Sequence, residues 1–371
     1  MIRRYLSICL IAVSLVLGNW TAVMAAAPQV TADAFCLYDT NANQIIWGRS
    51  IHQMRPPAST TKMLTAILAR GYCNFDDQIT ISEKADRTSG TSIGVKKGQI
   101  WRAEDLLKAA LARSANDACV ALAEYMAGSE TLFGMLMTKK AVVIGARESN
   151  FVNASGLPSK YHYSSAYDLA RIGTVLRHDP YLRKLVASPQ VDINHPGYPQ
   201  GLTLFNTNRL LLSYPGANGI KTGTTDAAGN CLVSSASRDG RNLIAVVLHS
   251  NDRYRDSRTL LDYGYQRTRL EKILSRREPY KYLRVQNGIK YKLTVKTADD
   301  VKLLMDKDNK TLMQQLVNLN YSPRARVLYG QHLGQLDIYY CGEKVITIPL
   351  VAAEEIPAQK KGIKQLLPWW H

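Results

Sequence analysis

The sequence GIKTGTTDAAGNCLVSSASRDGRNLIAVVL, residues 219–248, divides into three apolar stretches separated by two groups of turn residues. Asp226 to Gly229 and Arg238 to Gly240 both contain Asp and Gly, which are typical of tight turns between strands. The segment therefore predicts a three-stranded antiparallel meander. Its strands are expected at 219–225, 230–236 and 242–248.

The sequence on both sides of this meander predicts the rest of the domain. An Asp-Thr-Asn-Ala-Asn turn between apolar residues indicates a hairpin from Asp33 to Trp47. We expect helices over 59–70, 104–126 with a break at 113–116, 133–150, 165–177 and 257–274. Gly71 is expected to cap the first helix. Strands at both ends with helices between them predict an α+β domain, in which helices flank one antiparallel sheet.

A second, smaller domain is expected after this one, because 371 residues with 46% hydrophobic content suffice for a large core and a further module. Residues 267–284 hold seven Lys or Arg and one Pro, which indicates a linker. Apolar and polar residues then alternate around 289–295 and 336–340, as in half-buried strands. We expect the α+β domain at 26–275 and a small β-sandwich at 280–353.

The two ends of the chain carry their own signals. Arg3 and Arg4, an apolar run from Tyr5 to Leu17 and Val23-Met24-Ala25 are typical of a secretory signal peptide over residues 1–25. An uncleaved anchor is the alternative. The tail, residues 354–371, ends in Leu and Trp beside lysines, which fits a peripheral membrane segment or else a disordered or self-packed tail. The expected location is extracytoplasmic, in the periplasm or cell-wall space, with peripheral contact to the cytoplasmic membrane.

Charge and cysteine content narrow the class of protein. The net charge of +17 falls by the two charges of Arg3 and Arg4 to +15 once the signal is removed. We find no zinc-finger spacing and no basic helix interleaved with aromatic residues, so nucleic acid is not expected as a partner. Anionic wall polymers or lipid headgroups fit the charge, and so does a role in solubility alone. Five cysteines remain without Cys9, and neither a disulfide framework nor a metal or other cofactor is predicted.

Three short motifs in a fixed order describe a serine acyl-transfer site. Ser59 is followed three residues later by Lys62, and positions three apart share one face of a helix. Lys62 can therefore act as the base for Ser59, provided that burial or a neighbouring cation lowers its pKa from about 10.4. Ser114 is expected to relay the proton to the leaving amine, and Asn116 to bind the substrate amide.

The third motif is Lys221-Thr222-Gly223, which lies in the first strand of the meander. Glycine in a strand suggests that another backbone, here the substrate, approaches closely. The N–H groups of Ser59 and Thr224 would then form the oxyanion hole. Each motif also has a plain structural interpretation: Ser59 as a helix N-cap, residues 114–116 as a polar loop, and Lys221 as a solvated lysine on an edge strand.

The motifs and their surroundings resemble the penicillin-binding proteins, and within them the D-alanyl-D-alanine carboxypeptidase family of serine peptidases. The resemblance extends from the signal peptide to about residue 353. The matching segments are 57–62, 114–118, 153–157, 167–170, 219–223 and 260–264. It implies a β-lactamase/transpeptidase-like fold for the first domain and the family's C-terminal β domain for the second.

The resemblance also implies a function. Ser59 would be the acylated nucleophile, Lys62 its base and Ser114 the relay, while Lys221, Thr222 and Arg253 would hold the terminal carboxylate of the substrate. The expected substrates are peptidoglycan stem peptides ending in D-Ala-D-Ala, and β-lactams should acylate the same serine. The rivals are a serine β-lactamase, a DD-endopeptidase and a catalytically silent wall-binding protein; residues 148–168 lack the Glu-x-x-Leu-Asn pattern of class A β-lactamases.

Two positions depart from the family's usual sequence. Thr138 stands where Asn is common, and Asn43 stands in the first hairpin where Gly is usual. Neither departure is expected to touch the reacting atoms.

Overall fold

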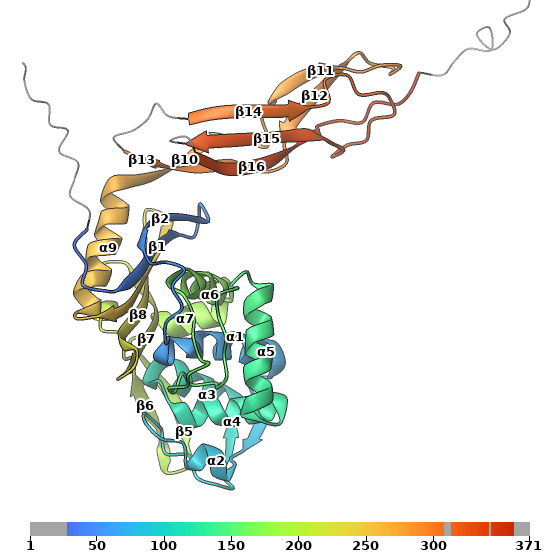
Figure 1. Ribbon diagram of the computed structural model, residues 1–371. Helices are drawn as coiled ribbons and strands as arrows, with labels where there is room; N and C mark the ends of the chain where they lie inside the picture. The colour runs from blue at the N-terminus through green and yellow to red at the C-terminus, as the bar shows by residue number, and fades with distance from the viewer. Residues whose placement is uncertain (1–27, 308–312, 341–342, 360–371) are drawn as a thin grey trace, which may run out of the picture.

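The computed structural model describes residues 28–307, 313–340 and 343–359, which form an α+β body, as predicted, and a smaller all-β unit joined by one helix (Figure 1). The signal peptide predicted over residues 1–25 lies outside the described residues. So do the Leu and Trp residues of the predicted membrane segment, at positions 366–370. Within the described part of the chain, no helix has both the length and the apolar character needed to cross a membrane.

The centre of the body is a five-stranded antiparallel sheet in the order β2-β1-β9-β8-β7. Its strands are β1 (Ala34–Asp39), β2 (Gln44–Arg49), β7 (Ala217–Thr225), β8 (Gly229–Arg238) and β9 (Arg241–Ser250). The predicted hairpin and meander are confirmed, and they pair with each other through β1 and β9. The strand that carries the Lys-Thr-Gly motif, β7, thus lies at one edge of the sheet.

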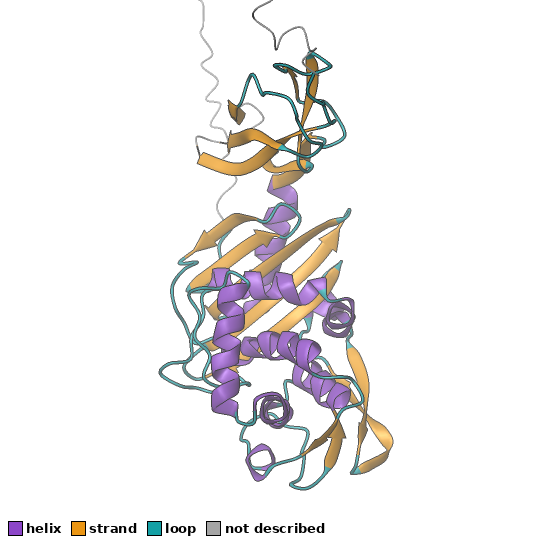
Figure 2. Ribbon diagram, turned by 90° about the vertical axis from the view of Figure 1, so that its right-hand side faces the viewer, coloured by secondary structure: helices purple, strands orange, loops and turns teal. Residues whose placement is uncertain are grey.

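Helices cover both faces of this sheet, and Figure 2 shows most of them gathered on one side. That side packs α1 (Lys62–Tyr72), α3 (Ala103–Lys108), α4 (Asn116–Ala127), α5 (Glu130–Val143), α6 (Ala166–His178) and α7 (Pro180–Ala187). The other face is covered by α8 (Leu210–Ser213) and α9 (Arg253–Arg267). Successive residues of β9 alternate between the two cores, because neighbouring side chains of a strand point to opposite faces. Residues 243–248 are consequently apolar without a break and all buried.

Several expectations for the helices need correction. The first helix does not stop at Gly71: α1 continues to Tyr72 and ends where Cys73 becomes extended. A short 3-10 turn, Ala58–Thr61, precedes it. The break near 113–116 is confirmed, although a turn of π-helix (Ala109–Arg113) leads into it. The elements not foreseen are short: β3 (Gln78–Thr80), α2 (Glu83–Asp86), β4 (Ile100–Arg102), α7, β5 (Gln190–His195), β6 (Tyr198–Phe205) and α8.

The C-terminal unit consists of two antiparallel sheets that share one apolar core. The larger has the order β11-β12-β16-β15-β14, and the smaller pairs β10 with β13. Its strands are β10 (Thr268–Leu274), β11 (Lys281–Arg284), β12 (Lys292–Thr297), β13 (Val301–Asp306), β14 (Met313–Leu319), β15 (His332–Tyr340) and β16 (Glu343–Ala352). Leu293, Leu303 and Leu336 are fully buried in this core.

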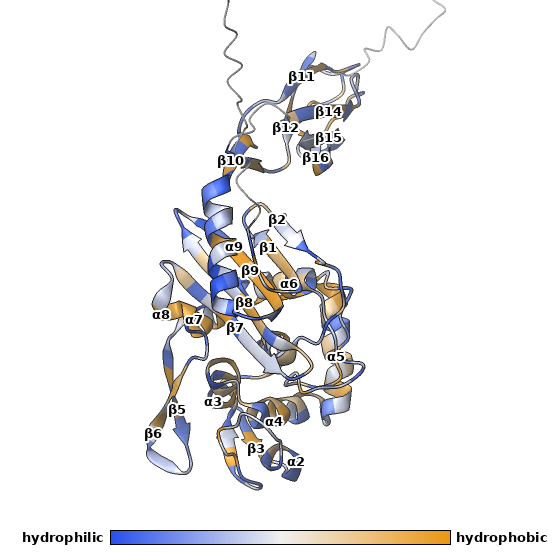
Figure 3. Ribbon diagram, turned by 60° about the vertical axis from the view of Figure 1, so that its left-hand side comes forward, coloured by the Kyte–Doolittle hydropathy of each residue, from blue (hydrophilic) through white to orange (hydrophobic). Residues whose placement is uncertain are grey.

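The expected helix to residue 274 and the expected linker over 267–284 are wrong. Helix α9 ends at Arg267, and β10 follows at once and pairs with β13. Ile273 and Leu274 pack against the C-terminal core, so tertiary pairing overrides the helical pattern of this segment. Figure 3 shows α9 as the hydrophilic connection that leads to β10. We therefore place the proposed junction of the two domains at Arg267–Thr268 instead of at 275–280.

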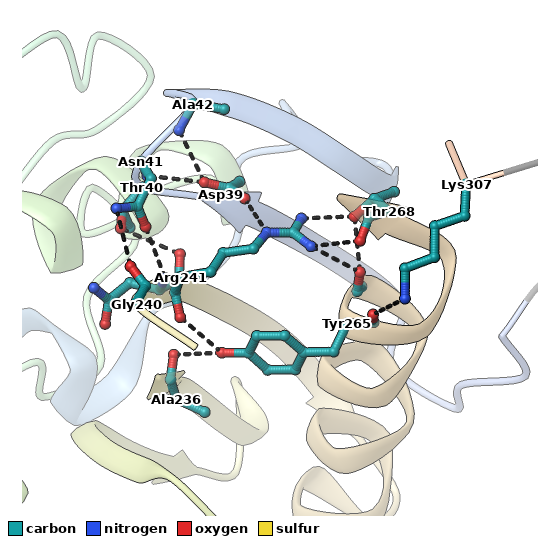
Figure 4. A network of polar contacts seen from close by, with 12 residues as sticks. Asp39, Thr40, Asn41, Ala42, Ala236, Gly240, Arg241, Tyr265, Thr268 and Lys307 are labelled. Carbon is teal, nitrogen blue, oxygen red and sulfur yellow. Dashed lines mark hydrogen bonds and ion pairs between the residues drawn. The ribbon is translucent and has the colours of Figure 1, made fainter. Parts of the chain in front are cut away.

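A buried polar network fixes this junction (Figure 4). The Arg241 guanidinium donates Nε to Asp39 Oδ2 at 2.5 Å, Nη1 to the Thr268 carbonyl at 2.7 Å and Nη2 to Thr268 Oγ1 at 2.6 Å. Asp39 is fully buried and also accepts the N–H groups of the β1–β2 turn. One arginine thereby connects the first hairpin, β9 and the end of α9.

Arg241→Ala is expected to lower the free energy of unfolding by about 3–5 kcal/mol, because it leaves the buried Asp39 carboxylate without its partner. Urea unfolding followed by tryptophan fluorescence measures this loss. Arg255→Ala is the matched control: Arg255 is exposed on α9, and its removal should change stability by less than about 0.5 kcal/mol. Equal midpoints for the two variants would contradict the role given to Arg241.

Candidate active site

Ser59 lies in the 3-10 turn Ala58–Thr61, between the edge strand β7 and helix α1. The turn is compact: Ala58 has a left-handed φ of 49°, and Thr60 Oγ1 donates to the Pro57 carbonyl at 2.7 Å. Ser59 itself is half-buried. The side chain does not cap the helix, since no side-chain hydrogen bond caps either the turn or α1. The interpretation of Ser59 as an N-cap is therefore wrong.

Two glycines allow this turn to sit where it does. A Cβ on Gly223 of β7 would lie 3.1 Å from the Ser59 nitrogen, and one on Gly156 would lie 1.9 Å from the Ala58 carbonyl oxygen. Gly156 also has a φ of 85°, which side chains rarely tolerate. The close approach predicted at Gly223 is real, but the backbone that approaches it belongs to the serine turn of the protein itself.

Gly156→Ala is expected to displace the serine turn, because the new methyl group overlaps the Ala58 carbonyl. We expect a loss of about 1–3 kcal/mol in stability and of about 10²-fold in the rate of penicillin acylation. Gly71→Ala is the matched control: it adds the same methyl group on α1 where nothing lies within 4 Å, and should stabilise the protein by up to about 1 kcal/mol. Normal acylation of the Gly156 variant would contradict this account.

Lys62 starts α1 and is completely buried. Its Nζ lies 2.8 Å from Ser59 Oγ, 2.7 Å from Asn116 Oδ1 and 2.7 Å from the Ser155 carbonyl oxygen. Burial lowers the pKa of Lys62 to about 8. Of the two causes predicted for this shift, burial is the one that acts; no neighbouring cation contributes, and Cys119 and Asp117 oppose the shift.

The three partners decide where the lone pair of a neutral Lys62 points. Asn116 Oδ1 and the Ser155 carbonyl can only accept, so they take the two N–H groups of the neutral amine. Ser59 is the one partner of the three that can donate. Its hydroxyl hydrogen therefore points at the Lys62 lone pair, which is the arrangement that a general base requires.

Ser114 and Asn116 follow the π-helical turn at Ala109–Arg113. Ser114 has a left-handed φ of 68°, a conformation that is costly outside glycine and is common at functional sites. The Asn116 amide donates Nδ2 to the Ser89 carbonyl at 2.8 Å and accepts from Lys62 with Oδ1. In this structure Asn116 Oδ1 therefore holds Lys62, and the contact of the amide with the substrate stays a prediction, for which the second Nδ2 hydrogen is available.

Lys221 is buried as deeply as Lys62, with 1% of its surface exposed. Its Nζ donates to the Thr222 carbonyl at 3.2 Å. Burial and then the charge of Lys62 hold the pKa of Lys221 well below its ordinary value. The interpretation as a solvated lysine is therefore wrong, and two lysine side chains lie together in the interior behind Ser59.

A cavity of about 440 Å³ opens in front of these groups. Six of the predicted site residues line it: Ser59, Ser114, Thr222, Gly223, Thr224 and Arg253. Lys62, Asn116 and Lys221 are not among its lining residues. The sequence motifs thus meet at one cavity, with Ser59 on its wall and the buried Lys62 next to Ser59.

Arg253 begins α9 and reaches across to the edge strand. Its Nη1 donates to the Gly223 carbonyl at 2.8 Å and to Thr224 Oγ1 at 2.9 Å. Sequence reasoning missed five other lining residues, and two of them, Arg209 and Thr207, add polar groups beside the predicted ones. Arg209 adds a second guanidinium, and Thr207 Oγ1 lies 2.6 Å from Thr222 Oγ1. Both lie in the connection from β6 to β7, where no motif marked them.

Buried polar contacts keep the surrounding loops in place. The Asp117 carboxylate accepts N–H groups from Ile93, Gly94 and Val95, which fixes the loop that also supplies Thr91 to the cavity. His162 accepts the Val152 N–H with Nδ1, so its Nε2 carries the proton and donates to Thr61 Oγ1 at 2.8 Å. Burial, assisted by the Lys62 charge, lowers the pKa of His162 to about 4, and the imidazole is neutral at physiological pH.

The two departures from the family's usual sequence lie outside the cavity. Asn43 has a φ of 58°, which explains why glycine is usual there, and its Oδ1 accepts the Tyr38 hydroxyl at 2.5 Å. Thr138 Oγ1 accepts the Phe151 N–H at 2.9 Å and donates to the Gly134 carbonyl at 3.1 Å. Both residues stabilise local structure at a distance from the serine.

An antiparallel sheet flanked by helices, with a serine beside a buried lysine at its edge strand, defines a serine hydrolase of the penicillin-recognising fold. The model of the D-alanyl-D-alanine carboxypeptidase family of serine peptidases matches residues 21–252. The model of the C-terminal domain of penicillin-binding protein 5 matches residues 269–358. The chain belongs to the D-alanyl-D-alanine carboxypeptidase family, and it is a serine-type D-Ala-D-Ala carboxypeptidase and penicillin-binding protein.

Known relatives agree over nearly the whole length. The chain is 28% identical over 334 residues to the D-alanyl-D-alanine carboxypeptidase DacF of Bacillus subtilis, covering 88% of this chain and 86% of DacF. It is 29% identical over 346 residues to DacD of Escherichia coli, covering 89% and 88%. The crystal structure of penicillin binding protein 5 from Haemophilus influenzae superposes with a TM-score of 0.78 at 26% identity, covering 89% of this chain and 99% of that chain.

Proposed function

We propose that Ser59 carries the carboxypeptidase reaction, with Lys62 as its base, on peptidoglycan stem peptides that end in D-Ala-D-Ala. The observation that carries this proposal is the 2.8 Å contact between Ser59 Oγ and the buried Lys62 Nζ beside a cationic cavity. The carboxylate of the terminal D-alanine binds among Arg253, Thr222 and Thr224. Lys221 lies next to Thr222, with its Nζ donating to the Thr222 carbonyl, and Arg209 supplies a further guanidinium at the wall.

Acylation begins when Ser59 Oγ attacks the carbonyl carbon of the penultimate D-alanine while Lys62 Nζ accepts the hydroxyl proton. The developing oxyanion is stabilised by the N–H groups of Ser59 and Thr224. The C–N bond then breaks, and the leaving amine of D-alanine takes up a proton from Lys62 through the Ser114 hydroxyl. An ester on Ser59 and free D-alanine result.

Deacylation reverses the proton path. Water attacks the ester carbon and gives its proton to Lys62, the C–O bond to Ser59 breaks, and Ser59 Oγ recovers the proton. The shortened peptide leaves with a new carboxylate. In this scheme Asn116 positions Lys62 through Oδ1, and its Nδ2 group gives one hydrogen to the Ser89 carbonyl and keeps the other for the substrate amide.

β-Lactams fit the same site, because their strained amide would face Ser59 and their carboxylate would lie among the same cations. The crystal structure of a related protein, penicillin-binding protein D2 from Listeria monocytogenes, was determined in an ampicillin-bound form. We expect one covalent penicillin per molecule of this protein, attached to Ser59.

The setting of the reaction is also part of the proposal. The pattern of residues 1–25 supports export and cleavage after Ala25, which would place the enzyme outside the cytoplasm. Lysines with Leu and Trp in the tail support peripheral contact with the outer face of the cytoplasmic membrane. A role in maintaining cell shape would follow from trimming stem peptides in the wall.

The test is D-alanine release from a synthetic stem pentapeptide by the protein without residues 1–25. We expect each enzyme molecule to process many peptides and to release one D-alanine from each, and we expect bound penicillin to be hydrolysed slowly. Fast, sustained penicillin hydrolysis would instead indicate a β-lactamase. Release only from cross-linked dimers would indicate an endopeptidase, and neither release nor penicillin labelling would indicate a silent wall-binding protein.

A further inference from the structure

A second cavity, of about 580 Å³, adjoins the serine turn. Two segments line both cavities in succession. Pro57 and Ala58 line the second cavity and Ser59 the catalytic one, while β7 contributes residues 222–224 to the catalytic cavity and Thr225 to the second. The second cavity therefore begins where the catalytic cavity ends, along the edge strand. Its volume lies within the usual range for small-ligand sites, about 300–1,000 Å³.

The direction of a bound peptide follows from the charges. In the described sheet, β7 pairs on one side only, with β8, so an extended peptide can align with its other edge. The terminal carboxylate belongs among Arg253, Arg209 and Thr222, and the scissile carbonyl belongs at Ser59. The peptide then runs antiparallel to β7, and its amino-terminal part passes Thr225 and reaches the second cavity. An extended chain advances about 3.3 Å per residue, so the residue just before D-Ala-D-Ala lies at its mouth.

The lining of the second cavity indicates which side chain it accepts. Most of the wall is apolar: Met54, Pro56, Pro57, Ala58, Leu157, Pro158 and Ala227. Two cations, Arg55 and Lys160, also line it, and none of the lining residues is Asp or Glu.

The two cations differ in availability. Arg55 already donates Nη1 to Asp33 at 3.0 Å and Nε to Gln53 at 3.2 Å. Lys160 is exposed. Among the described residues, the one contact of its Nζ is with the Tyr161 ring, 5.6 Å from the ring centroid. A long aliphatic side chain would cover the apolar wall, and a carboxylate at its end would meet Lys160.

We propose that this cavity is the subsite for the side chain of the residue preceding D-Ala-D-Ala, and that it selects an aliphatic chain ending in a carboxylate over one ending in an amine. The inference rests on the proposed function, because it takes the orientation of the peptide from the Ser59 reaction. Lys160 is the specificity-determining residue of this subsite and takes no part in the chemistry.

The experiment compares kcat/KM for D-alanine release from three acetylated tripeptides X-D-Ala-D-Ala. X is an aliphatic residue ending in a carboxylate, a residue of the same length ending in an amine, or alanine. For the parent protein we expect the carboxylate peptide to exceed the amine peptide by about threefold to tenfold and the alanine peptide by at least about tenfold. Lys160→Glu should reverse the order of the two charged peptides.

Lys139→Glu is the matched control, because Lys139 is exposed on α5, lines neither cavity and undergoes the same charge change. It should keep the order of the parent protein. Equal kcat/KM for the three peptides, or the same order in parent and Lys160→Glu protein, would overturn the subsite. So would a preference of the parent for the amine peptide.

Labelled penicillin separates failure of the subsite from failure of the proposed function. The fraction of molecules labelled at the end point counts competent serines without using the peptide side chain. Complete labelling and D-alanine release without discrimination among the peptides would overturn the subsite alone. No labelling and no release would overturn the proposed function, and the subsite with it.

Discussion

Ser59→Ala protein is expected to release D-alanine from the stem pentapeptide at least about 10⁴-fold more slowly than the parent protein, and to bind no labelled penicillin covalently. Alanine removes the oxygen that forms the acyl-enzyme, and among the described hydrogen bonds Ser59 is the residue whose hydroxyl contacts the Lys62 amine. D-alanine release and gel detection of a fluorescent penicillin measure the two effects.

The fold of the Ser59 variant should be unchanged, because the substitution removes a single hydrogen bond, the one between Ser59 Oγ and Lys62 Nζ. A shift in stability of no more than about 1 kcal/mol is expected in urea unfolding. Ser322→Ala, at an exposed serine of the C-terminal unit, is the control and should keep full activity. Covalent labelling of the Ser59 variant would assign the nucleophile to another residue.

Lys62→Met should lower the rate of acylation by about 10²–10⁴-fold, the usual contribution of a general base. The variant removes the lone pair that faces Ser59, and it leaves the acceptors Asn116 Oδ1 and the Ser155 carbonyl unpaired, at about 1–3 kcal/mol each. Lys62→Arg separates the two effects, since an arginine keeps the donors and the charge but does not deprotonate. Both variants should acylate slowly, and stopped-flow measurement with a chromogenic cephalosporin follows the rate.

The pH dependence of the parent protein tests the same base. Because burial lowers the pKa of Lys62 to about 8, the fraction of neutral amine rises with pH and reaches one half near that value. The acylation rate should therefore rise about tenfold per pH unit below pH 8 and level off above it. A rate that stays constant between pH 6 and 9, or activity retained in Lys62→Arg, would exclude Lys62 as the base.

The sequence predicted the sheet and its motifs because these depend on local patterns. The turns at Asp226–Gly229 and Arg238–Gly240 specify the meander, and the spacing of Ser59 and Lys62 places both side chains on one helical face. Six of the nine predicted site residues line one cavity, and the other three are not among its lining residues.

What the sequence could not supply depends on contacts between distant segments. Thr268–Leu274 has the composition of a helix end but becomes a strand because β13 offers it a partner. The contact of Asn116 with Lys62 could not be predicted, because it depends on the carbonyl of Ser89, 27 residues away in the chain, which accepts one Nδ2 hydrogen and orients the amide. The sequence could not predict Arg209 as a lining residue of the cavity. No motif marks it, and it reaches the cavity only because the β5–β6 hairpin leads the chain back there.

The edge position of β7 also bears on self-association. An unpaired strand edge is a template on which other chains can add, and proteins usually cover it. Here the serine turn packs over the face of β7, where a Cβ on Gly223 would lie 3.0 Å from the Pro57 carbonyl oxygen, and in the described sheet β7 pairs with β8 alone. The edge on which the substrate peptide is expected to align is therefore left to it, and the same edge is where a second copy of the chain can add.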